Sequence, residues 1–301
     1  PTKTEQSDLL QAMFGRNGEA PLPVIAPRSP GDCFDAAIEA TRIALTYRTP
    51  VMLLSDGYLA NGAEPWAVPD VDSLPDLSAA VGFATGPNAE ATDGSPEFHP
   101  YKRDPETLAR AWAVPGTSGL QHRIGGLEKA DGNGNISYDP ANHDFMVRTR
   151  QAKIDGIAAS IGPTDVEDPD GDARVAVIGW GSTYGPIGAA CRRIRASGRK
   201  VAQIHLRHIN PFPADLGEVL ARYDRVVCPE MNLGQLALLL RAKFLVDVQS
   251  HTQVSGMPFR SAELVAVIQD AIDTSTTDTS TTDTRSTDAV PAGAAVNGAM
   301  Q

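Results

Sequence analysis

The chain has 301 residues, enough for more than one domain, because single hydrophobic cores stop growing at about 250 to 300 residues. Its 37 acidic and 26 basic side chains give a net charge of -11, which disfavours nucleic acid and anionic membranes as partners. Its three cysteines are too far apart to build an iron-sulfur cluster or a structural zinc site from this chain alone. The sequence contains no apolar run of about 18 residues and no apolar signal segment, so we expect a cytoplasmic protein outside the membrane.

Residues 1–70 alternate between helix and strand signals. We expect an amphipathic helix over 4–14, a buried strand over 22–27, a helix that starts at Ser29 and Pro30, and an apolar strand that begins near Pro50 and ends at 55–57. A strand, helix and strand in this order predict a parallel pair, and ligands gather at the carboxyl ends of parallel strands. Asp56 and Gly57 lie at such an end, which makes them candidates for a cofactor site or an interface.

Residues 71–173 are interrupted by Pro and Gly and predict a long irregular connector with one helix near 143–161. His122 and Arg123 in this connector are candidates for ligand binding or for a subunit contact. The segment around Asp131 resembles the start of a calcium loop, but Ile136 and Asn142 stand where such a loop needs glycine and glutamate. We therefore predict no metal site on this chain.

Residues 174–273 predict a second α/β domain with a parallel sheet between two layers of helices. Its expected strands cover 174–180, 200–206, 225–231 and 245–250, and its expected helices cover 186–197, 213–223, 233–244 and 261–272. Beyond this domain, residues 274–301 repeat Thr, Ser and Asp and end in Ala and Gly, so we expect a disordered tail.

The first strand of the second domain runs into a glycine-spaced turn, GWGSTYG. A strand, a glycine turn and a helix are typical of nucleotide sites, but Tyr184 stands where the dinucleotide fingerprint needs its third glycine. Arg207 near the end of the next strand would suit the 2'-phosphate of NADP. Gly181 and Ser182 therefore belong either to an NADP site or to a turn that only packs against its surroundings.

Glu230 and Asn232 follow the third expected strand and precede a helix. The free N-H groups of that helix would favour an anion, whereas the alternative is that Asn232 caps the helix.

Seven segments in collinear order resemble the alpha subunit of 2-oxoacid:ferredoxin oxidoreductases, most closely the 2-oxoglutarate type. They are PTKTEQSDLL, SPGDCFDAAIEATRIALTYRTPVMLLSDGYLA, QHRIGGLEK, YDPANH, GWGSTYG, HLRHINPFPADL and VVCPEMNLGQLALLLRAKFLVDVQ. The resemblance implies that residues 1–70 are the end of the domain that holds the pyrimidine of thiamine diphosphate. It also implies that residues 174–273 are similar to the transketolase C-terminal domain, in which the glycine turn is structural or contacts a neighbouring subunit.

The same resemblance implies a function: CoA-dependent oxidative decarboxylation of 2-oxoglutarate to succinyl-CoA and CO2, with reduction of ferredoxin. Thiamine diphosphate and Mg2+ would be shared with a beta subunit that carries a [4Fe-4S] cluster, in an alpha2beta2 heterotetramer. The family's threonine for the substrate carboxylate matches Thr2, beside Lys3. Other parts of the family's site would precede Pro1, so we expect this chain to be the C-terminal part of an alpha subunit and inactive alone. An NADP-binding oxidoreductase domain and a non-catalytic assembly module remain as alternatives.

Overall fold

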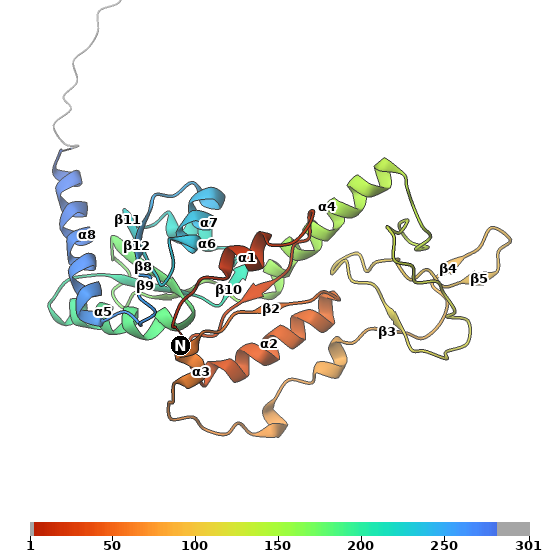
Figure 1. Ribbon diagram of the computed structural model, residues 1–301, viewed down its shortest axis with the longest axis horizontal. Coiled ribbons are helices and arrows are strands. Elements are labelled where there is room, and N and C mark those ends of the chain that lie inside the picture. Colours follow the sequence, from red (N-terminus) through yellow and green to blue (C-terminus); the bar gives the residue numbers. More distant parts are fainter. Residues whose placement is uncertain (1–2, 282–301) are drawn as a thin grey trace, which may run out of the picture.

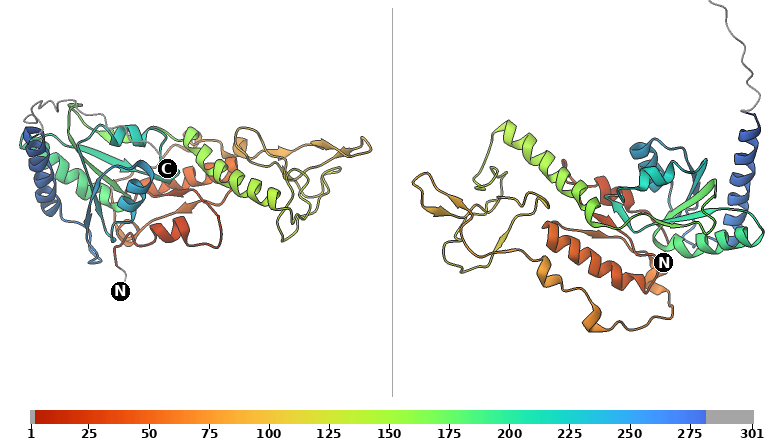
Figure 2. Two further views of the ribbon diagram at one scale, coloured as in Figure 1. Left: turned by 90° about the horizontal axis from the view of Figure 1, so that it is seen from above. Right: turned by 180° about the vertical axis from the view of Figure 1, so that it is seen from behind.

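The structure of the protein is a computed structural model that describes residues 3–281. Two sheets lie side by side, and a connector projects from them (Figure 1). Figure 2 shows from two further sides that this connector and the last helix lie at opposite ends of the molecule. None of the helices within residues 3–281 combines the length and the apolar character that crossing a membrane requires.

The smaller sheet has the strand order β10-β1-β2. As expected, β1 and β2 run parallel, with Val24 opposite Met52. The third strand was not expected, because β10 leaves the second half of the chain and pairs antiparallel with β1. The elements around this sheet are α1 (Leu9–Phe14), β1 (Val24–Ile25), α2 (Asp32–Tyr47), β2 (Met52–Leu53), α3 (Gly57–Asn61) and β10 (His208–Asn210).

The helix expected over 4–14 begins only at Leu9, so the first half of that prediction is wrong. The side chain of Gln6 is held by backbone groups of Trp180 and Met231, and the N-H of Thr4 donates to the carbonyl of Gly256. These hydrogen bonds to distant parts of the chain outweigh the local preference for a helix, because helix propensity by itself determines structure only weakly.

The larger sheet has the strand order β12-β11-β8-β9-β7 and is parallel except for the edge strand β7. It confirms the expected α/β class. Its elements are β7 (Asp165–Glu167), β8 (Val175–Trp180), a 3-10 turn η4 (Gly181–Thr183), α5 (Tyr184–Ala196), β9 (Ala202–Leu206), α6 (Leu216–Leu220), β11 (Arg225–Glu230), α7 (Gln235–Phe244), β12 (Val248–Thr252) and α8 (Ser261–Thr281).

The central strand β8 is apolar on both faces, because helices cover both sides of the larger sheet. Ile178 packs with α6 and α7 on one face, whereas Val177 packs with α5 and α8 on the other. All six residues of β8 are buried. This is the expected three-layer arrangement.

Two expectations for the flanks of this domain need correction. Residues 164–173, expected as the end of the irregular connector, include a strand of the larger sheet, because β7 pairs with β9, with Asp165 opposite His205. Residues 274–281 are not a disordered tail, since they continue α8, whose buried side chains include Ile268 and Ala271. Residues 282–301 lie outside the described part of the chain.

The connector contains short elements instead of being irregular throughout. They are η1 (Val71–Ser73), η2 (Leu77–Ala80), β3 (Phe83–Ala84), β4 (Ala89–Glu90), β5 (Pro96–Glu97), β6 (Trp112–Ala113), α4 (Pro140–Gly156) and η3 (Ile157–Ser160). Helix α4 starts on the Asp139 cap with Pro140 in its first turn, and it links the connector to the sheets (Figure 1).

Candidate functional site

The glycine turn between β8 and α5 is shaped by close packing. A Cβ atom on Gly179 would collide with the side chains of Ile187 and Thr183. Gly181 has a φ of 57°, a left-handed conformation that costs other residues about 1 to 2 kcal/mol. A Cβ on Gly185 would meet nothing within 4 Å. The first two glycines therefore serve the turn and the strand-helix contact.

Protein groups fill the mouth of this turn. Nε2 of Gln6 donates to the carbonyl of Trp180 at 2.8 Å, and the hydroxyl of Thr183 donates to the same carbonyl at 2.7 Å. The hydroxyl of Ser182 donates to the carboxylate of Asp56 from the smaller sheet. Ser182 thus joins the two halves of the chain at this turn.

The end of β9 argues against NADP as well. Arg207, the side chain that would hold a 2'-phosphate, forms an ion pair with Asp32, which is buried. The guanidinium of Arg28 lies over the ring of Tyr184, 4.7 Å from its centre. Both cations near this turn therefore already have partners.

His205 is a polar residue in the same place that our sequence analysis did not single out as a site. It is 5% exposed, neither ring nitrogen has a hydrogen-bond partner, and its ring centre lies 5.0 Å from that of Tyr184. Burial, with the charges of Arg28 and Arg207, lowers the pKa of His205 to about 3. The imidazole is therefore neutral at ordinary pH.

Glu230 is completely buried at the end of β11, and its carboxylate serves the next helix. It accepts from the N-H of Leu236 at 2.7 Å and the N-H of Ala237 at 3.0 Å, in the first turn of α7. It also accepts from Nε1 of Trp180 at 3.3 Å. A carboxylate in this position satisfies free N-H groups and suits the helix dipole.

Asn232 caps the same helix. This agrees with the second interpretation in the sequence analysis, in which Asn232 is a helix cap and not part of an anion site. Its side-chain oxygen accepts from the N-H groups of Gly234 at 2.8 Å and Gln235 at 3.0 Å. Its Nδ2 donates to the carbonyl of Gln6 at 2.9 Å. Glu230 and Asn232 therefore hold the N-terminal segment against the larger sheet, and their polar atoms are occupied by the protein.

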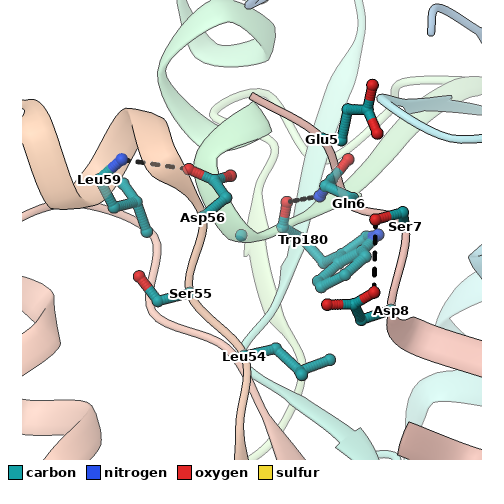
Figure 3. Close-up of a pocket in the computed structure, with 10 residues that line it drawn as sticks. Glu5, Gln6, Ser7, Asp8, Leu54, Ser55, Asp56, Leu59 and Trp180 are labelled. Atoms are coloured by element: carbon teal, nitrogen blue, oxygen red, sulfur yellow. Dashed lines mark hydrogen bonds between the residues drawn. The ribbon is translucent and has the colours of Figure 1, made fainter. Parts of the chain in front are cut away.

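A pocket lies where the N-terminal segment, the end of β2 and the glycine turn meet (Figure 3). Its side chains are mostly polar or acidic. They belong to Glu5, Gln6, Ser7, Asp8, Leu54, Ser55, Asp56, Leu59, Trp180 and Gly181. Such a lining suits a hydrogen-bond donor or a cation better than an anion.

Asp56 has two roles beside this pocket. Its Oδ1 accepts from the N-H groups of Tyr58 at 2.9 Å and Leu59 at 3.1 Å, which caps α3, while its Oδ2 accepts from Ser182. Gly57 is the first residue of that helix. Strand β2 ends at Leu53, so Asp56 follows it by three residues and caps a helix instead of ending the strand. No local signal indicated Gln6, whose partners are 174 and 225 positions away.

The remaining predicted site residues lie elsewhere. Lys3 is exposed and runs along Gly256, where a Cβ would be 2.8 Å from Cδ of the lysine. Thr2 lies outside the described residues. His122 contacts the carbonyl of Leu120 at 2.8 Å, and neither it nor Arg123 lines the pocket.

Residues 3–281 contain no group of three or more His, Cys, Asp or Glu side chains that could hold a metal ion. The acidic pocket also lacks a cation for a diphosphate. This part of the chain therefore does not fit a complete site for thiamine diphosphate with its metal.

Comparisons with known proteins give a consistent result. Residues 1–136 match the family described as pyruvate flavodoxin/ferredoxin oxidoreductase, thiamine diP-bdg, and residues 173–272 match pyruvate:ferredoxin oxidoreductase core domain II. Subunit KorA of 2-oxoglutarate oxidoreductase from Mycobacterium tuberculosis is 61% identical over 272 residues, which cover 90% of this chain and 40% of that protein. The alpha subunit of 2-oxoacid:ferredoxin oxidoreductase 2 from Aeropyrum pernix is 31% identical, with 91% and 42% covered.

A solved structure of 2-oxoglutarate:ferredoxin oxidoreductase from Magnetococcus marinus, with 2-oxoglutarate, coenzyme A and succinyl-CoA bound, is also similar. It superposes with a TM-score of 0.78 at 31% identity, over 90% of this chain and 46% of that one. The chain spans less than half the length of these relatives.

Proposed function

We propose that the chain, which belongs to the family of 2-oxoacid:ferredoxin oxidoreductase alpha subunits, is part of such a subunit in a 2-oxoglutarate:ferredoxin oxidoreductase. The observation that carries this proposal is the 61% identity to a 2-oxoglutarate oxidoreductase subunit over 90% of the chain. The complete enzyme would convert 2-oxoglutarate and CoA to succinyl-CoA and CO2 and pass two electrons, one at a time, to ferredoxin.

The remaining parts of the site would come from elsewhere in the assembly. We infer a beta subunit that carries a [4Fe-4S] cluster and binds the diphosphate with Mg2+, in a cytoplasmic alpha2beta2 complex. When bound, thiamine diphosphate supplies the electron sink for decarboxylation. Residues 1–70 would complete the pyrimidine-binding domain, and residues 174–273 would form the transketolase C-terminal-like domain.

The role of this chain would be to position its own N-terminal segment. Gln6 is fixed by the backbone of Trp180 and Met231 and by the amide of Asn232, and all three contacts are buried. A rigid anchor four residues after Thr2 restricts where Thr2 and Lys3 can lie. We propose that these two side chains bind the carboxylate of the 2-oxo acid, Thr2 as a hydrogen-bond donor and Lys3 as a cation.

The test is Thr2→Ala in the intact complex. Loss of one hydrogen bond to a charged group, about 1.5 kcal/mol, should raise KM for 2-oxoglutarate about tenfold. Thr4→Ala is the matched control, because the N-H of Thr4, which the substitution keeps, donates to Gly256. An unchanged KM in Thr2→Ala would remove Thr2 from the site, and an equal rise in Thr4→Ala would point to a disturbed segment instead.

A second candidate is a non-catalytic assembly module, which the apolar edge of the smaller sheet favours. Met52 and Leu53 on β2 are 38% and 40% exposed, although they form a strand of the sheet. An assembly module should associate tightly with the beta subunit whether or not thiamine diphosphate and Mg2+ are present. Sedimentation of the mixture with and without both cofactors distinguishes the two functions.

A further inference from the structure

Basic side chains gather in a cavity between helix α4 and the earlier part of the connector, residues 101–129, far along the chain from the pocket of Figure 3. Arg103 and Arg110 come from the connector, and Arg150 and Lys153 come from α4. Tyr101 also lines the cavity. This cluster is unusual in a chain with a net charge of -11, so its charges need an explanation.

Few of these charges are neutralised. Arg103 pairs with Asp131 at 2.6 Å, whereas Arg110 and Lys153 form no ion pair among residues 3–281, and Arg150 interacts with Glu128 through charge without a direct ion pair. The guanidinium of Arg110 lies over the ring of Tyr101, 4.6 Å from its centre, a contact that leaves its edge N-H groups free.

The cavity has one carboxylate in its lining, Glu128, which interacts with Arg150 through charge and with two other side chains directly. Glu128 contacts Nδ1 of His143 and accepts from Nδ2 of Asn142 at 3.1 Å. The buried ammonium of Lys129 is satisfied as well, because it donates to the carbonyls of Gly125 and Leu127. The cavity therefore keeps an excess of positive charge.

The pKa of Lys153 reflects this excess of positive charge. Burial, followed by the charges of Arg103 and Arg110, lowers the pKa of Lys153 to about 8. An anion that enters the cavity would stabilise the protonated form of Lys153. Guanidinium groups bind phosphate oxygens in pairs, and an ammonium adds a compact charge.

We propose that this cavity binds a phosphate group of a phosphorylated small molecule, held by Arg110, Arg150 and Lys153. The cations line a concave site of which Lys153 forms a half-buried wall, and this favours a small oxyanion over a flat acidic protein surface. The proposal does not depend on the proposed function, although CoA carries phosphate groups and is one of the ligands to be compared.

The first test is calorimetric titration of the protein with inorganic phosphate, CoA and dephospho-CoA. Arg150→Gln should weaken phosphate binding about tenfold, as expected for one charge-assisted contact. Arg148→Gln is the matched control, because Arg148 lies on the same helix, is paired with Asp144 and does not line this cavity. An equal loss in both variants, or no phosphate binding at millimolar concentration, overturns the proposal.

The ligand series separates the sources of the phosphate. Tighter binding of CoA than of dephospho-CoA or inorganic phosphate identifies the 3'-phosphate of CoA as the anion. Equal binding of all three supports a general phosphate site and leaves the proposed oxidoreductase function to its own assay.

The second test needs no variant. Because the pKa of Lys153 is low, its amine should react with an acylating reagent at pH 8 faster than that of Lys200, whose pKa is raised by a hydrogen bond to Asp172. Saturating phosphate should slow the labelling of Lys153 about twofold at pH 8, as expected for a rise of half a pKa unit, and leave Lys200 unchanged, as read by peptide mass spectrometry. Labelling of Lys153 that phosphate does not change overturns the proposal.

Discussion

The neutral, buried imidazole of His205 should make the protein lose stability as the pH falls. In the unfolded chain this group titrates with a pKa near 6.5, whereas in the folded protein its pKa is about 3. Between these values the unfolded state binds a proton that the folded state excludes. The free energy of unfolding should therefore decrease as the pH is lowered from about 6.5 toward 3.

The size of the effect follows from this difference. Each pH unit inside the window is worth up to about 1.4 kcal/mol, so the contribution of His205 between pH 7 and pH 5 is about 2 kcal/mol. His205→Leu removes this contribution. It also removes two ring nitrogens without partners, worth about 1 to 3 kcal/mol, at the cost of about 1 kcal/mol for the contact with Tyr184.

The assay is urea unfolding at pH 7 and pH 5, followed by tryptophan fluorescence, to which the buried Trp180 contributes. His205→Leu should be at least as stable as the original protein at pH 7 and should lose about 2 kcal/mol less on going to pH 5. Cys191→Ala is the control, because Cys191 is completely buried in the same domain and the imidazole stays in place. It should lower stability by about 1 kcal/mol at both pH values. If His205→Leu loses as much stability between the two pH values as the original protein, His205 is not held neutral by the fold.

Two further predictions concern the residues around the glycine turn. Glu230→Gln should lower the free energy of unfolding by about 3 kcal/mol, because the NH2 group of the new amide would face N-H donors that now bind the carboxylate. A loss below about 1 kcal/mol in urea unfolding would contradict the capping role of Glu230. Gly181→Ala should lower stability by about 1 to 2 kcal/mol through its left-handed backbone, with the new Cβ 3.2 Å from Nε2 of Gln6. Gly185→Ala, in the first turn of α5 with free space around it, should be neutral or stabilise the protein by up to about 1 kcal/mol. A lower melting temperature for Gly185→Ala than for Gly181→Ala would refute this explanation of the turn.

The sequence by itself determined the local elements and their order. Residues 174–260 alternate apolar strands with helices whose ends carry Gly, Pro or Asn, and these signals act over a few positions. Strands β8, β9 and β11 lie where they were expected, whereas β12 begins at Val248, three residues later than expected. The parallel pair β1 and β2 followed from the strand-helix-strand order, and the collinear motifs identified a family that the comparisons confirm.

Only the tertiary structure decided what the candidate site residues do. Gln6 meets Trp180, Asp56 meets Ser182, and β10 leaves its own half of the chain to pair with β1. These contacts join positions more than 100 residues apart, and no local pattern encodes them. Glu230 shows the physical reason: an acidic residue before a helix fits both an anion-facing site and a cap, and only the donors that fold around its carboxylate distinguish the two.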